Sequence, residues 1–149
     1  NADGQVVISG AREAVERAVA AAAEKGARKS VMLPVSAPFH CGLMAPAADA
    51  MAEALAITDL RQPLVPLVAN VLADKLEDPS EIRIRLVEQV TGMVRWRESV
   101  LWMASQGVTD IVEIGAGKVL TGMAKRIDRS LKGNAVGTPE EIAAFLETL

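Results

Sequence analysis

The stretch VPLVANV, Val65–Val71, restricts the possible fold more than any other part of the sequence. It is an apolar run of strand length, which is typical of a strand covered on both faces within a parallel sheet. A clear helix start follows it, with Asp78 as the expected N-cap, Pro79 at the first helical position and Glu81 completing a D-x-x-E variant of the capping box. This succession predicts an α/β fold.

The sequence after this point continues to alternate between helix and strand signals. Glycines stand where helices should stop, and apolar residues recur at helical or strand spacing between them. Thr138, Pro139 and Glu140 form a further helix start near the C-terminus. The predicted elements are a helix ending at Gly92, a helix over about 97–106, a strand at 110–115, a helix within 118–131, a strand at 134–137 and a helix from Thr138.

The first part of the chain predicts a small β-α-β piece over residues 1–35. Val6, Val7 and Ile8 form a β-prone run, and AREAVERAVAAAAEKG, residues 11–26, has helical spacing up to a stop at Gly26. The alternating apolar residues of 31–35 predict the second strand. A further helix is expected over residues 42–56, with its apolar residues on one face.

Composition excludes several classes of function. The 149 residues include 16 Lys and Arg against 19 Asp and Glu, so the net charge of −3 gives no broad positive field for nucleic acid. Charged residues interrupt every apolar stretch before it reaches membrane-spanning length. The single cysteine fits a reducing compartment, and we expect the cytoplasm. The chain starts at Asn1 without an initiator Met, which predicts a fragment of a longer protein.

The turn GAGK, Gly115–Lys118, lies between a predicted strand and a predicted helix, where a phosphate could bind. A Walker loop needs a longer spacing followed by Ser or Thr, yet Val119 follows the lysine. The dinucleotide fingerprint also fails, because Leu120 stands at the third glycine position. Tight strand-to-helix packing is therefore favoured over a nucleotide site.

Cys41 and Ser36 are weak candidates for a nucleophile. Cys41 follows His40 directly, and adjacent side chains diverge, so a buried small hydrophobic role is favoured over a thiol nucleophile. Ser36 is separated from His40 by Pro38, and no serine of the chain lies in a G-x-S-x-G motif. One histidine and one thiol do not make a metal site, and we expect neither metal nor redox cofactor.

His40, the only histidine, lies just before the helix expected from Gly42. The positive end of a helix dipole next to the ring disfavours imidazolium, and a neutral imidazole can accept a proton. A loop histidine satisfied by backbone groups is the other interpretation, and the pattern of residues alone does not decide between them.

Three stretches together resemble the C-terminal half of bacterial malonyl-CoA:acyl carrier protein transacylase. They are NADGQVVISG from Asn1, LPVSAPFHCGLMAPAADAM from Leu33 and EIGAGKVLTGMAKRI from Glu113. GAGK stands where that family usually has a proline between the glycines, a small departure. The larger departure is that the N-terminal half of the family, with the G-H-S-x-G nucleophile serine, the oxyanion-hole donors and the malonyl-binding arginine, is missing.

The resemblance implies roles for particular residues. His40 matches the general base that activates the serine, so that malonyl passes from coenzyme A to serine and then to the phosphopantetheine thiol of acyl carrier protein. Gln89 matches the position whose backbone carbonyl orients that base, and it is expected in the last turn of a helix, where carbonyls lack partners. Phe39 matches a residue associated with malonyl selection, because its ring would crowd an extra methyl group. Asn1 matches an asparagine of the family's active site.

The resemblance also implies an architecture: residues 1–35 as part of a ferredoxin-like small subdomain and residues 36–149 as the C-terminal part of an α/β hydrolase-like large subdomain. The expected partners are malonyl-CoA, acyl carrier protein and the missing N-terminal half, with no nucleic acid and no membrane. A noncatalytic α/β fragment, or one module of a split protein that associates with its partner half, is the alternative. Either would expose apolar surface that the missing half normally covers.

Overall fold

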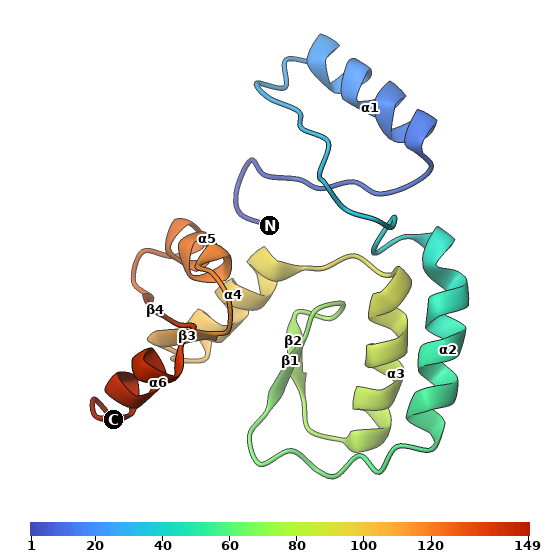
Figure 1. The fold of residues 1–149 in the computed structure, drawn as a ribbon. Coiled ribbons are helices and arrows are strands. Elements are labelled where there is room, and N and C mark those ends of the chain that lie inside the picture. Colours follow the sequence, from blue (N-terminus) through green and yellow to red (C-terminus); the bar gives the residue numbers. More distant parts are fainter. The chain divides into compact units, whose positions relative to one another are not determined.

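The computed structural model describes residues 1–149 and divides them into two compact units (Figure 1). One unit contains residues 7–71 and 75–94, and the other contains residues 1–6, 72–74 and 95–149. His40 and Gln89 both belong to the first, which we call the histidine unit. The second contains the C-terminal helices, and we call it the C-terminal unit.

The histidine unit is built around a pair of packed helices. Its elements are α1 (Arg12–Glu24), the 3-10 turn η1 (Gly42–Met44), α2 (Ala45–Ala56), β1 (Leu67–Ala69), α3 (Pro79–Thr91) and most of β2 (Asp74–Leu76). Helices α2 and α3 lie side by side, and η1 also contacts α3. Strands β1 and β2 pair in a sheet of their own, and the turn between them is too short for a parallel connection.

The start and the end of α3 confirm the predicted N-cap, the first-turn proline and the stop, whereas Glu81 does not return a bond to complete the predicted capping box. The Asp78 side chain accepts a hydrogen bond of 2.9 Å from the Glu81 backbone N–H, and Pro79 stands in the first turn. The Glu81 carboxylate accepts from Arg85. At the other end the backbone of Gly92 is extended, so α3 stops where the sequence predicted. The structure also confirms the helix expected over 42–56, as η1 followed by α2.

The C-terminal unit is a parallel strand pair with helices. Its elements are α4 (Trp96–Ser105), β3 (Asp110–Ile114), α5 (Val119–Ile127), β4 (Lys132–Val136) and α6 (Pro139–Leu146). Strands β3 and β4 are parallel, in a register that pairs Asp110 with Lys132, and α5 forms the crossover between them. The predicted strands and helices of this region are confirmed, including the capped helix start at Thr138; the structure adds a capping box between Thr138 and Glu141, which was not predicted.

The core of this unit lies between α4 and α5. Val100 is fully buried, and it packs with Ala124 and Leu131. Partly buried side chains surround this cluster: Trp96, Met103, Ala104, Ile111 and Ile127. Burial of such a cluster is the main favourable contribution to the stability of a unit of this size.

The predicted β-α-β piece over residues 1–35 is wrong for this chain except for its helix, α1. Residues 6–8 and 31–35 are not strands, and Val6, Ile8 and Val31 are more than half exposed. A strand needs a partner for its N–H and C=O groups, and these segments find none in the chain. The subdomain boundary at residue 35 concerns the intact fold and stays a prediction.

The run Val65–Val71 also differs from its prediction. Only Leu67–Ala69 is a strand, and it pairs with β2 rather than entering a parallel sheet. Leu64 and Val65 are exposed, whereas the prediction had both faces covered. The structure is nevertheless a mixed α/β fold, with its parallel pair in the C-terminal unit.

Candidate active site

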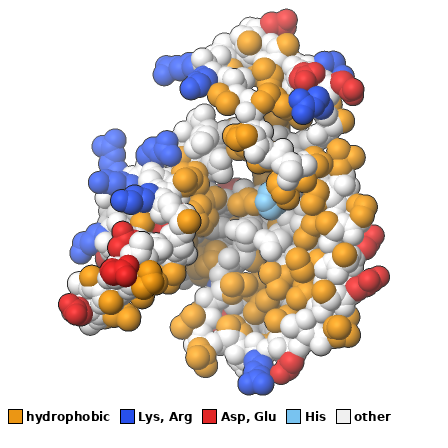
Figure 2. Space-filling view, viewed as in Figure 1, with side chains coloured by type: hydrophobic (Ala, Val, Ile, Leu, Met, Phe, Trp, Pro, Cys, Tyr) orange, Lys and Arg blue, Asp and Glu red, His pale blue; other side chains and the backbone are white.

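His40 lies in the loop between residues 31–35 and η1, and its side chain is exposed at the surface, where histidine is coloured pale blue in Figure 2. Its backbone has a φ of 60°, in the left-handed region that few side chains adopt. Histidine is among the residues that tolerate this region better than most, so the loop can turn there without glycine.

The ring of His40 is held by the end of α3. Its Nδ1 atom lies 2.9 Å from the backbone carbonyl oxygen of Gln89. A carbonyl oxygen only accepts hydrogen bonds, so Nδ1 carries the hydrogen in this contact. In the neutral ring the lone pair is then on Nε2, which leaves that nitrogen able to accept a proton.

The Gln89 carbonyl is available because it lies in the last turn of α3, where carbonyls have no partner within the helix. The preceding carbonyl, that of Glu88, accepts from the Gly92 backbone N–H at 2.9 Å. The Gln89 side chain is also held, since its Oε1 accepts a hydrogen bond of 2.9 Å from Asn70 Nδ2. Both the main chain and the side chain of Gln89 therefore have fixed partners.

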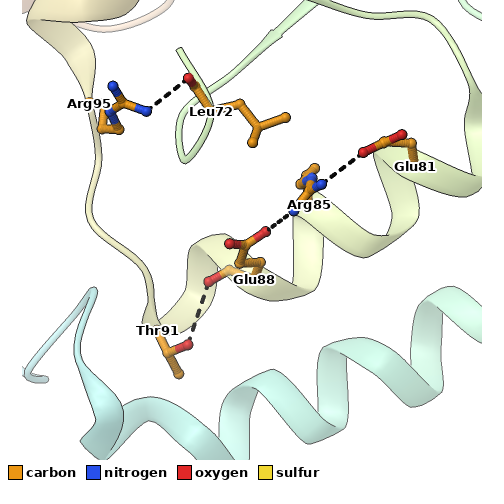
Figure 3. Close-up of polar contacts among 6 residues, drawn as sticks. All are labelled: Leu72, Glu81, Arg85, Glu88, Thr91 and Arg95. Carbon is orange, nitrogen blue, oxygen red and sulfur yellow. Dashed lines mark hydrogen bonds and ion pairs between the residues drawn. The ribbon is translucent and has the colours of Figure 1, made fainter. Parts of the chain in front are cut away.

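An ion-pair ladder runs along α3 toward this turn (Figure 3). Arg85 donates to Glu81 at 2.8 Å and to Glu88 at 2.6 Å, and the hydrogen bonds with Glu88 and then Glu81 raise the pKa of Arg85. The Thr91 hydroxyl contacts the Glu88 carbonyl at 3.5 Å. Pairs at this spacing stabilise a helix, so the ladder supports the turns that lead to Gln89. Figure 3 also shows Arg95 donating to the Leu72 carbonyl, within the C-terminal unit.

The residues beside His40 are placed as follows. Phe39, the residue before His40, is 44% exposed, so part of its side chain is open to solvent. Cys41 is half-buried rather than buried as predicted, and its Sγ atom donates to the Pro38 carbonyl at 3.1 Å. Ser36 lies in an exposed bend of the same loop.

Asn1 belongs to the C-terminal unit and is half-buried. Near it, Asp3 forms an ion pair with Arg97 at the start of α4. The expected place of Asn1 in an active site stays a prediction, as do the roles of His40, Gln89 and Phe39.

The GAGK turn needs its glycines for their backbone angles and not for the predicted tight packing, because a Cβ atom built at Gly115 or Gly117 meets nothing within 4 Å. Gly115 and Gly117 have φ values of 132° and 96°, which other residues rarely adopt. The start of α5 is occupied by Glu113, whose carboxylate accepts from the Thr121 N–H at 2.8 Å, the Thr121 hydroxyl at 2.7 Å and the Leu120 N–H at 3.1 Å. These bonds, those of Thr121 above all, lower the pKa of Glu113. The position where an anion could bind is thus filled by the protein's own carboxylate.

No group of three or more His, Cys, Asp or Glu side chains is arranged to hold a metal ion. No helix has the length and apolar character that crossing a membrane requires.

Sequence reasoning missed Asn70. The signal was present, because a polar residue interrupts the apolar run just after Ala69. Polar groups at strand ends are often functional or bonded to a neighbouring element.

Comparison with known proteins gives consistent relatives, although no family model matches the sequence. The malonyl CoA-acyl carrier protein transacylase of Bacillus subtilis is 43% identical over 149 residues, which cover 100% of this chain and 47% of that protein. The transacylase of Escherichia coli strain K12 is 48% identical over 147 residues, covering 99% and 48%. The chain thus spans about half the length of the curated relatives it matches.

The solved structures that this chain resembles are named as malonyltransferases or transacylases, like the sequence relatives. An acyl-carrier-protein-S-malonyltransferase from Bartonella henselae matches with a TM-score of 0.85 and 53% identity, over 91% of this chain and 43% of that one. A malonyl-transacylase in complex with its type II PKS acyl carrier protein matches with a TM-score of 0.86 and 41% identity, over 93% and 45%. In sequence and in fold, this chain is therefore similar along nearly all its length to about half of a malonyl CoA-acyl carrier protein transacylase.

Proposed function

We propose that this chain is the histidine-bearing half of an acyltransferase of fatty acid biosynthesis. The intact enzyme moves a malonyl group from coenzyme A to the phosphopantetheine thiol of acyl carrier protein through a serine ester. This chain supplies the general base, His40, and the missing half supplies the serine. The proposal extends to the subdomains: residues 1–35 belong to the ferredoxin-like one and residues 36–149 to the hydrolase-like one.

The observation that carries the proposal is the hydrogen bond between His40 Nδ1 and the Gln89 carbonyl. A general base needs a ring of defined orientation with a free nitrogen, and this contact directs the hydrogen to Nδ1 and leaves Nε2 free. A hydrolase triad uses a carboxylate for this purpose. Here a neutral carbonyl serves, so the imidazolium formed in the reaction gains no ion pair and readily returns its proton.

The chemistry follows from this arrangement. Nε2 accepts the serine proton while the serine oxygen attacks the thioester carbonyl, and the imidazolium then protonates the departing thiolate of coenzyme A. In the second half-reaction the same nitrogen accepts the proton of the phosphopantetheine thiol, whose sulfur attacks the serine ester. The serine leaves with that proton. One imidazole thus serves both transfers.

The surface of the chain supports a missing partner half. Large apolar side chains stand exposed along the segments expected to pair as strands, among them Val6, Val31 and Leu33. Leu64 and Val65 are exposed before β1, and Figure 2 shows hydrophobic side chains, in orange, at the surface. Monomeric proteins seldom leave so many such residues uncovered, so we propose that the N-terminal half of the enzyme covers them.

The test is the first half-reaction in the full-length enzyme, measured as malonylation of the serine by mass spectrometry after rapid mixing with malonyl-CoA. We expect His40→Ala to slow it by at least about a hundredfold, within the usual range for loss of a general base. His40→Asn is the matched variant, because asparagine tolerates the left-handed backbone of this loop. Near-normal acylation by both variants would refute the base and favour a noncatalytic module.

A further inference from the structure

Asn70 is a polar residue that the proposed mechanism leaves unused. It follows β1, and its Nδ2 atom donates to Gln89 Oε1 at 2.9 Å. The carbonyl of the same Gln89 accepts from His40. A chain of hydrogen bonds therefore links the end of β1, the last turn of α3 and the loop of His40, all within the histidine unit.

We propose that Asn70 is a positioning residue for His40, acting through Gln89. This inference rests on the proposed function, in which His40 is the general base. The last turn of a helix tends to fray, and its carbonyls are not held by the helix itself. The bond from Asn70 ties the Gln89 side chain to the strand, and this fixes the peptide whose carbonyl orients the imidazole.

The surroundings make this bond more than a surface contact. Asn70 and Gln89 are both half-buried, and they line a small hollow of about 180 Å³. Most of the other side chains around it are apolar, as with Leu67, Ile82 and Leu86. An amide left without a partner in such surroundings is costly, so the two amides have reason to stay paired.

The geometry distinguishes positioning from catalysis. The contact of His40 is with the backbone of Gln89, whereas the contact of Asn70 is with its side chain. Replacing the side-chain amide of Gln89 therefore keeps the backbone carbonyl but removes the hydrogen bond that anchors it. Gln89→Met and Asn70→Leu, which keep similar volumes, should have the same effect. Asn70→Asp should restore the anchor, because the Gln89 amide can turn and donate its N–H to the new carboxylate.

The experiment is a double-mutant cycle in the full-length enzyme, with serine acylation by malonyl-CoA as the readout. We expect Asn70→Leu and Gln89→Met each to lower kcat roughly tenfold with little change in KM, and the double variant to be no slower than either. Asn70→Asp should stay within about threefold of the unchanged enzyme. Single effects that multiply in the double variant would overturn the proposal.

A second readout follows the ring itself. The imidazole ¹⁵N spectrum of the full-length enzyme, with the His40 signals identified by their loss in His40→Ala, should show the Nδ1–H tautomer. In Asn70→Leu the spectrum should move toward a mixture of tautomers, and in Asn70→Asp it should move back. Unchanged spectra would refute positioning even if His40 is the base, whereas normal acylation by His40→Ala would refute the base alone. If Asn70→Leu does not fold, the kcat values and the imidazole spectra of Gln89→Met and Asn70→Asp test the proposal instead.

Discussion

Gly92 controls the turn that presents the Gln89 carbonyl, and replacing it should damage that turn. A Cβ atom built at this position lies 2.9 Å from the Glu88 carbonyl oxygen and 3.0 Å from Val71 Cγ1. Ordinary contacts begin at 3.4 Å, so the methyl group of alanine would be about 0.5 Å too close to a backbone atom that cannot rotate away. Either α3 loses its last turn or the chain after it moves.

The expected cost follows from these distances. Overpacking of this kind costs about 1–3 kcal/mol, and the lower entropy of the unfolded chain with alanine returns about 0.4–1 kcal/mol. We therefore expect Gly92→Ala to lower the free energy of unfolding by about 1–2 kcal/mol. Because Gln89 lies in the displaced turn, the contact of its carbonyl with His40 should lengthen, and serine acylation should slow roughly tenfold or more.

The assay is urea unfolding of the full-length enzyme, together with the acylation rate of the folded variant. Gly122→Ala is the matched control, since Gly122 lies within α5 and a Cβ atom there meets nothing within 4 Å. Alanine favours a helix over glycine, so this variant should be more stable by up to about 1 kcal/mol. A Gly92→Ala enzyme as stable and as fast as the original would refute the reasoning.

Two further predictions concern Glu113 and Phe39. Hydrogen bonds from Thr121 lower the pKa of Glu113 in the folded state. The Glu113 carboxylate therefore stabilises the fold fully at pH values above the ordinary pKa of 4.5, and this stabilisation is lost as the pH falls through the lowered pKa of the folded state. The urea midpoint of Glu113→Gln should therefore lie below that of the unchanged protein at neutral pH, and the gap should narrow in acid; a gap independent of pH would contradict this. Phe39→Ser should raise the preference for methylmalonyl-CoA over malonyl-CoA by about tenfold in competition assays, and an unchanged ratio would remove Phe39 from selection.

Local sequence signals predict an element correctly where the chain itself contains every group that the element needs. The caps at Asp78 and Thr138 bond only to residues of their own helices, so their outcome could be predicted from spacing. Strands depend on partners instead. Residues 6–8 and 31–35 have strand composition, yet without a partner in the chain they remain unpaired.

In the candidate site, too, features within one element could be predicted from the sequence, whereas contacts between elements could not. That the end of α3 would offer free carbonyls followed from the helix signals, but that Gln89 in particular meets His40 followed only from the resemblance, because the two are distant in sequence. No spacing rule links Asn70 to either of them. Contacts between loop, helix and strand depend on how the elements pack, and periodicity within one element does not contain that information.

The carboxylate of Glu113 at the start of α5 also bears on how a donor such as coenzyme A could be held. Hydrogen bonds from the Gly137 and Thr138 N–H groups lower the pKa of Glu141, and the charge of Lys118 adds a smaller effect in the same direction. The start of α5 is bonded to the Glu113 carboxylate, whose negative charge would repel a phosphate there. If the proposed function holds, we expect the cations that neutralise the phosphates of the donor to lie on other surfaces, and the salt sensitivity of donor binding should be unaffected by Lys118→Gln.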